Sequence, residues 1–249
     1  MGNKVREIPR WKTSQLPPNF FKESYFLRNL PVIFTDLTKD WAAIGKWTPD
    51  LIVDKYGDKR ATGLTWEGSE IDDFLHYTRR TTTIREWRDL ILHPEQPNKR
   101  AYLTFPVFQV MPDMMKDIRP VDPYFCLPRG YPAALRRKAK KPASLWFGAK
   151  GQVSPMHFDV SQNILVQVYG TKRMKLYPPD QSKYLYWPCD HDAPFSFHNV
   201  NWTPVNADNP DLEKHPLFAQ AEGIEITLEP GDALYLPVRW WHFTTSVTD

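Results

Sequence analysis

The chain has 249 residues, which is long enough for one β-rich domain with a sizeable hydrophobic core. Its 32 basic and 29 acidic residues give a formal net charge of +3, too small to indicate a nucleic-acid-binding surface. The only cysteines are Cys126 and Cys189, and one possible bridge excludes a disulfide scaffold for a fold of this size.

No secretory signal is visible at the N-terminus. Residues 1–11 are polar and charged, and no run of about 20 apolar residues follows anywhere in the chain. We therefore expect a cytoplasmic protein without a membrane span, and a nuclear location stays open for a eukaryotic source.

Residues 1–100 are predicted to mix helices and strands. A short helix is expected over Phe20–Tyr25 and a strand over Leu30–Phe34. Thr48 can cap a helix that has Pro49 at its first position. Two further helices are predicted over residues 71–77 and 83–92, the second because its apolar residues recur at helical spacing.

Residues 101–249 are predicted to be rich in strands. One strand begins at Tyr102–Phe105 and another covers Leu145–Gly148. Between them, the basic run Arg136–Lys141 is more often solvated surface than a binding site, and it is not interleaved with aromatic residues.

The stretch Val153–Pro179 contains the triplet His157, Phe158, Asp159. In a strand, residues i and i+2 point to the same face, so the imidazole and the carboxylate would converge. An apolar strand follows, turns at Gly170 and returns to a double proline. Such a triplet alone is more often structural than metal-binding.

An iron site of the two-histidine, one-carboxylate type needs a second imidazole and keeps open positions. His242 offers one, 85 residues after His157 and just after the turn and apolar strand of Glu229–Pro237. The neighbouring Trp240 and Trp241 are more typical of core than of chemistry. The remaining histidines lack a partner at strand spacing and are interpreted as surface or structural: His76, His93, His191, His198 and His215.

Three stretches, Ser154–Pro179, Asn209–Phe218 and residues 230–242 (PGDALYLPVRWWH), resemble the JmjC or cupin-like family of Fe(II)- and 2-oxoglutarate-dependent dioxygenases. They look most like the branch of the asparaginyl hydroxylase called factor inhibiting HIF. The resemblance implies a mainly β fold, a double-stranded β-helix (jelly-roll) barrel with N-terminal and flanking α-helices. It implies a single domain over 1–249, with 1–100 packing on a β-helix core of 101–249. It also implies that His157, Asp159 and His242 bind Fe(II).

The resemblance implies 2-oxoglutarate as co-substrate, whose distal carboxylate needs a cation and hydroxyls. Lys172 and Lys175 compete for that role, and their odd separation puts them on opposite faces of a strand. The family match selects Lys172, with Ser154 and Tyr102 as the hydroxyls. Asn163 matches a residue that lines the same pocket.

The implied activity is hydroxylation of an unactivated C–H, with a protein or peptide side chain as the expected substrate. A small molecule or tRNA base is an alternative substrate, and a non-catalytic cupin-fold binding module is an alternative function. Lysine demethylation is an alternative activity that the sequence favours less than hydroxylation. Nucleic acid and membrane partners are not expected, and the oligomeric state is left open.

The sequence departs from the asparaginyl hydroxylase pattern in two respects. Ser161, His191 and Asp192 stand where that enzyme holds its target side chain, so the target is expected to be recognised differently. The last core strand of the family should follow His242, and the sequence up to Asp249 is not expected to contain it. Three explanations stay open: the chain is truncated, the barrel closes differently, or a partner completes it.

Overall fold

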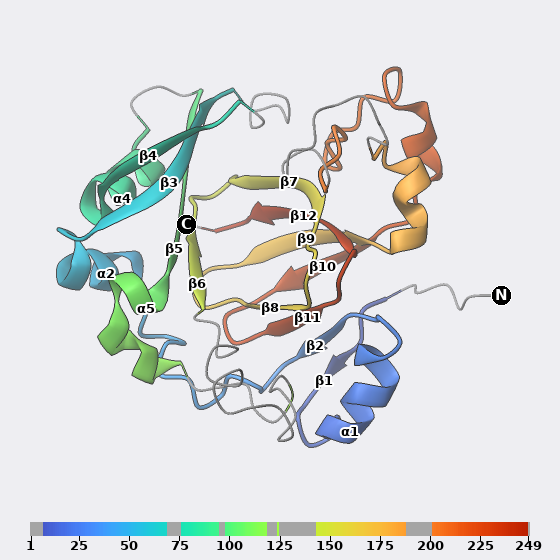
Figure 1. Ribbon diagram of the computed structural model, residues 1–249, viewed down its shortest axis with the longest axis horizontal. Coiled ribbons are helices and arrows are strands. Elements are labelled where there is room, and N and C mark those ends of the chain that lie inside the picture. The colour runs from blue at the N-terminus through green and yellow to red at the C-terminus, as the bar shows by residue number, and fades with distance from the viewer. Residues whose placement is uncertain are drawn as a thin grey trace.

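The computed structural model describes residues 7–68, 76–94, 98–118, 124, 143–187 and 201–248 (Figure 1). Within these ranges the strands form three sheets of four strands each. Several predictions lie outside the described residues: the helix over 71–75, the basic run Arg136–Lys141, both cysteines, His191, Asp192 and His198. His76 and Tyr77, the end of that predicted helix, are described and are not helical.

The first sheet joins the N-terminal segment to the C-terminal half of the chain. Its strand order is β1 (Arg10–Trp11), β2 (Val32–Phe34), β11 (Ala233–Leu236) and β8 (Asn163–Val166). Every residue of β2 and β11 is buried, as expected for apolar strands in the middle of a sheet. The strand predicted over Leu30–Phe34 is therefore confirmed and belongs to the barrel itself.

The second sheet is entirely antiparallel. Its order is β10 (Ile224–Leu228), β9 (Lys172–Tyr177), β12 (Trp241–Ser246) and β7 (Val153–Phe158). Met174 and Leu176 of this sheet pack against Ile33 and Leu234 of the first. Two facing sheets with a shared apolar interior form a jelly-roll barrel, which confirms the predicted fold class.

The third sheet lies beside the barrel and consists of β4 (Thr78–Thr83), β3 (Arg60–Glu67), β5 (Lys99–Pro106) and β6 (Ser144–Phe147). Helices α2 (Pro49–Tyr56) and α4 (Ile84–Leu92) cover its outer face through a core that includes Trp87. The Trp87 ring lies over Gly63, where a Cβ atom would come within 2.8 Å of it. Gly63 is therefore needed for this close helix-to-sheet packing.

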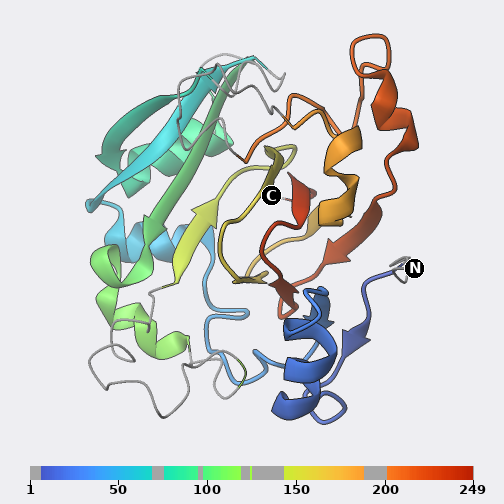
Figure 2. The same ribbon diagram turned by 45° about the vertical axis from the view of Figure 1, so that its right-hand side comes forward.

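Two of the predicted helix starts, at Thr48 and Thr83, are confirmed by their caps. The Thr48 side chain accepts a hydrogen bond from Leu51 N at 3.1 Å, and Thr83 accepts one from Glu86 N at 3.2 Å. The first helix continues from α1 (Pro18–Phe21) into a π-helical turn, Lys22–Phe26. Further short elements are α5 (Val107–Val110) and the 3-10 segments Pro112–Asp117, Pro179–Tyr184 and Pro216–Gln220. Pro179–Tyr184 and Pro216–Gln220 are drawn in orange and lie on the side of the barrel opposite the third sheet (Figure 2).

Candidate metal centre

The structure brings together the three residues predicted as metal ligands. One ligating atom each from His157, Asp159 and His242 lies within 4.8 Å of the other two. His157 on β7 and His242 on β12 are direct cross-strand partners, and Asp159 is the first residue after β7 ends. Strand pairing thus brings residues that are 85 positions apart in the sequence into one cluster.

Both imidazoles are held in the tautomer that a metal ion requires. His157 Nδ1 lies 2.7 Å from Pro155 O, and His242 Nδ1 lies 3.1 Å from Trp240 O. A backbone carbonyl can only accept, so each Nδ1 is assigned the proton. Each Nε2 then keeps its lone pair for a ligand, as in most metal-bound histidines.

Burial keeps the two histidines neutral. It lowers the pKa of His157 well below its usual 6.5, and the neighbouring His242 lowers it further. Burial also lowers the pKa of His242, although the charge of Asp159 opposes this shift. Neutral imidazole is the form that binds a metal ion.

Asp159 is oriented by two neighbours. Asn163 Nδ2 donates to Asp159 Oδ2 at 2.8 Å, and Arg239 N donates to the backbone carbonyl of Asp159 at 3.0 Å. Asn163 was predicted to line the co-substrate pocket, and in this structure its amide contacts the carboxylate. Metal-bound carboxylates are commonly held by such secondary hydrogen bonds.

The two candidate lysines lie on opposite faces of β9. Lys175 is on the outer face, where its Nζ lies 2.9 Å from Asp208 Oδ1 and 2.7 Å from Ala207 O. Lys172 pairs with Ser246, on the same face of the sheet as His242. Its side chain has no hydrogen-bond or ion-pair partner among the described residues, which leaves its charge available to an anion.

A β-bulge brings Ser154 to the same face as His157. Pairing proceeds from His242↔His157 to Thr244↔Ser154, so β7 contains one more residue than β12 over this interval. Without the bulge, residues three apart in a strand would face opposite sides. With it, Ser154 lies opposite Thr244, on the inner side of the barrel.

Tyr102 reaches the site from the third sheet. It is buried, and it packs with Trp66 and Trp202 in one aromatic cluster. Trp202 in turn stacks on His157, with ring centroids 4.3 Å apart and planes 15° apart. Sequence reasoning missed Trp202, because it stands outside the regular strands with no motif around it that indicates a contact with the metal ligands.

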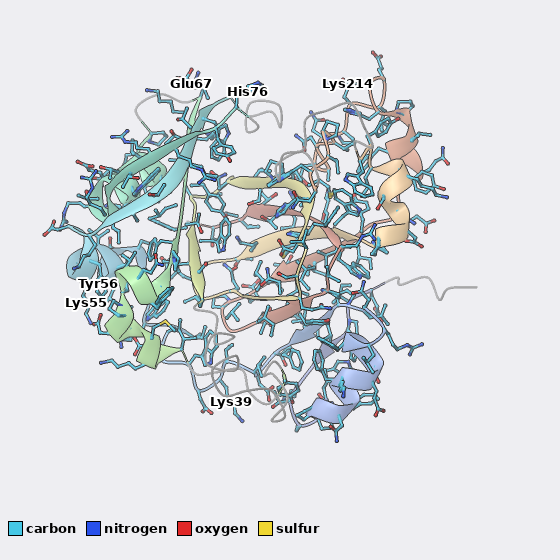
Figure 3. The ribbon with its side chains drawn as sticks, in the orientation of Figure 1. Lys39, Lys55, Tyr56, Glu67, His76 and Lys214 are labelled. Carbon is cyan, nitrogen blue, oxygen red and sulfur yellow. The ribbon has the colours of Figure 1, made fainter. Side chains whose placement is uncertain are left out.

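The two tryptophans interpreted as core, and the described histidines interpreted as surface or structural, lie in the following surroundings. Trp240 and Trp241 are buried, and His215 is buried with its ring 4.8 Å from that of Tyr186. Figure 3 shows His76 at the same end of the third sheet as Glu67. His93 is exposed at the end of α4.

The donor set fits Fe(II). Two neutral imidazoles and one carboxylate are the ligand types of the non-haem iron sites that use oxygen, and such sites leave coordination positions open. Within the described residues, this is the one group of three or more histidine, cysteine or acidic side chains close enough to hold a metal ion.

A family model described as "Cupin-like domain" matches residues 17–249. The chain belongs to the cupin-like domain family. It is 31% identical over 248 residues to "Lysine-specific demethylase 8" of Danio rerio, which covers 98% of this chain and 57% of that protein. It is 28% identical over 248 residues to "Lysine-specific demethylase JMJ30" of Arabidopsis thaliana, covering 95% of this chain and 52% of that protein.

A shorter match is to "HSPB1-associated protein 1" of Homo sapiens, 36% identical over 109 residues, 42% of this chain and 21% of that protein. This cupin-like chain thus spans about half the length of the first curated relatives it matches. None of the helices in the described ranges is long and apolar enough to cross a membrane.

Proposed function

We propose that this cupin-like domain is an Fe(II)- and 2-oxoglutarate-dependent dioxygenase that hydroxylates an unactivated C–H on a protein or peptide side chain. The observation that carries the proposal is the cluster of His157, Asp159 and His242, with both Nδ1 atoms bonded to carbonyls. That arrangement leaves two imidazole lone pairs and one carboxylate available to a metal ion, with the ligating atoms within 4.8 Å of one another.

Each residue has a distinct role in this proposal. His157, Asp159 and His242 would hold Fe(II), and Asn163 keeps the Asp159 carboxylate in place. When both are bound, Fe(II) and 2-oxoglutarate would supply electrons that activate dioxygen, with one oxygen atom going to the C–H bond and the other oxidising 2-oxoglutarate to succinate and CO2.

The co-substrate pocket is formed by a cation and two hydroxyls. Lys172 would pair with the distal carboxylate of 2-oxoglutarate, while the hydroxyls of Ser154 and Tyr102 would donate hydrogen bonds to it. Tyr102 and His242 are buried, and electrostatic contacts are stronger beside buried groups than in bulk water.

The two lysines provide a matched test. We expect Lys172→Ala to weaken 2-oxoglutarate binding by at least about 10-fold, because a hydrogen bond between charged groups contributes on the order of 1.5–3 kcal/mol. Lys175→Ala removes an equal charge from the outer face and should leave that affinity within about 2-fold. Calorimetric titration of 2-oxoglutarate into the metal-loaded protein measures both, and equal losses would contradict the assignment of Lys172.

Peptide hydroxylation tests the activity itself. The protein is incubated with Fe(II), 2-oxoglutarate and a peptide library, and mass spectrometry detects the gain of one oxygen. Asp159→Ala should abolish both this gain and the turnover of 2-oxoglutarate in the absence of peptide. Undiminished turnover in that variant would contradict the proposed ligand set.

The names of two relatives favour one second candidate, demethylation of lysine. Hydroxylation of an N-methyl C–H is the same oxidation and gives an unstable product that releases formaldehyde. Methylated lysine peptides in the same assay distinguish the two, since demethylation lowers the peptide mass by one methylene.

Two alternatives have distinct outcomes. Turnover with a metabolite or tRNA and not with peptides would indicate a different substrate class. Failure to bind both Fe(II) and 2-oxoglutarate in calorimetry would indicate a binding module. The predicted cytoplasmic location is checked by imaging a tagged chain in its host cell.

A further inference from the structure

Residues Asn201–Thr203 form an additional short partner for β7. Phe158 N donates to Asn201 O at 3.0 Å, and Thr203 N donates to Met156 O at 3.0 Å. These two bonds flank an isolated antiparallel bridge between His157 and Trp202. The segment therefore occupies the edge of β7 that β12 does not use.

The hydrogen-bond pattern makes His157 and Trp202 a non-hydrogen-bonded pair. In such a pair the two Cα atoms approach to about 4.5 Å, and their side chains lie on the same face and in contact. The rings accordingly stack, with centroids 4.3 Å apart and an interplanar angle of 15°. On the other side of His157, the His242 ring centroid is 4.1 Å away.

The indole of Trp202 is itself supported from behind. It packs with Trp66 of β3 and Tyr102 of β5, both of which are buried. A third hydrogen bond, from Asn201 Nδ2 to Phe158 O at 2.7 Å, fixes the backbone next to it. The ring therefore fills the space between the metal-binding strand and the third sheet.

The hydrogen bond from His157 Nδ1 to Pro155 O fixes one ring atom, and the ring can still swing about that contact. A flat indole against the face of the imidazole removes this freedom, so that Nε2 stays directed at Asp159 and His242. Side chains that orient a metal ligand typically change metal affinity by about 10–100-fold when they are removed.

We propose that Trp202 is a positioning residue, which presets the His157 imidazole for the metal ion and connects it to the third sheet through Tyr102. The proposal rests on the metal site of the proposed function. It assigns to Trp202 no contact with the ion or the substrate, only an effect through His157.

The test uses Co(II) alone as the probe, because its visible absorption reports both binding and ligand geometry. We expect Trp202→Ala to bind Co(II) at least about 10-fold more weakly and to alter the absorption band. Trp202→Phe keeps an aromatic ring against the imidazole and should stay within about 3-fold of the wild-type chain. Thermal unfolding without metal verifies that each variant folds.

The matched control is Trp146→Ala. Trp146 lies in the same neighbourhood, with its ring centroid 5.5 Å from that of Tyr102, but 57% of it is exposed. Its loss should leave Co(II) affinity within about 2-fold, since within the described residues the ring contacts of the two histidines are with Trp202 and with each other.

Two results would overturn the proposal while leaving the metal site intact. Wild-type affinity and absorption in Trp202→Ala would show that the stack does not orient His157. Equal losses of Co(II) affinity in Trp202→Ala and Trp202→Phe would show that an aromatic ring against the imidazole does not determine that affinity. Failure of the proposed function is distinguishable, because Asp159→Ala would then bind Co(II) as well as the wild-type chain does.

Discussion

At the scale of single residues, the proposed metal site contains groups that would orient the ligands as well as the three candidate ligands themselves. Asn163 is the clearest case, since its amide bonds the Asp159 carboxylate at 2.8 Å. Removing it with Asn163→Ala should free the carboxylate to rotate and lower Co(II) affinity by about 10-fold. Asn19→Ala, on the exposed face of α1, should have no effect in the same titration.

A buried carboxylate away from the site gives a pH-dependent prediction. Asp117 accepts hydrogen bonds from Lys46 Nζ at 2.7 Å and Trp47 Nε1 at 3.0 Å. The bond from Lys46, more than that from Trp47, holds the pKa of Asp117 below its usual 3.8. Because the folded pKa is below the unfolded one, this stabilisation is complete above about pH 4 and is lost as the pH falls through the folded value.

The substitution Asp117→Asn should remove that dependence. We expect it to lower the free energy of unfolding at pH 7 by about 1–3 kcal/mol, since it weakens two hydrogen bonds to a buried group. Urea unfolding at pH 7 and pH 3 should then show a smaller pH difference than in the wild-type chain. Asp50→Asn is the control, because the Asp50 side chain is 83% exposed and should change neither value appreciably.

At the scale of elements, the packing of α4 on the third sheet bears on the site. A Cβ atom at Gly63 would lie 2.8 Å from both the Trp87 ring and the backbone carbonyl of Tyr102. Gly63→Ala should therefore destabilise the fold by about 1–3 kcal/mol and displace Tyr102. The decisive measurement is 2-oxoglutarate affinity, which we expect to fall in this variant.

Gly151→Ala is the control for Gly63→Ala, because it adds backbone strain without displacing a neighbouring residue. Gly151 has φ +77°, and a Cβ atom there would meet no atom of a non-adjacent residue within 4 Å, so alanine adds only backbone strain, about 1 kcal/mol. Its 2-oxoglutarate affinity should stay at the wild-type value. Loss of affinity in both variants would contradict a specific path through Tyr102.

Sequence patterns predicted the elements whose signals are local. The Thr48 cap, the helix start at Thr83 and the turn at Gly170 depend on neighbouring residues, and each is present. The bulge in β7 was not predictable in this way, because an extra residue is defined only by the partner strand.

The candidate site also combines features that the local sequence predicts with features that depend on strand register or tertiary contacts. His157 and Asp159 converge through strand periodicity, whereas His242 was assigned by resemblance, and its place opposite His157 comes from strand register. The stack of Trp202 on His157 depends on a tertiary contact that no local pattern specifies. Asn163 was predicted near the co-substrate, and its contact with Asp159 follows from the way the chain turns between β7 and β8.

At the scale of the whole molecule, the ligands tie distant parts of the chain together. Binding of an ion to the folded state alone should raise the free energy of unfolding by about 2.7 kcal/mol at a concentration about 100 times Kd. We expect a matching rise in Tm when Co(II) is added to the wild-type chain. His242→Ala should show no such rise, and an equal rise would place the bound ion elsewhere.

The position of β12 between β9 and β7 also bears on how an ion would leave the site. His242 is fixed by hydrogen-bonded ladders on both sides, so it cannot move away without opening the centre of the sheet. Asp159 lies beyond the end of β7 and can swing outward once its bond to Asn163 breaks. We therefore expect dissociation to begin at the carboxylate, so that the lifetime of the bound ion reflects the opening of that turn and not the unfolding of the barrel.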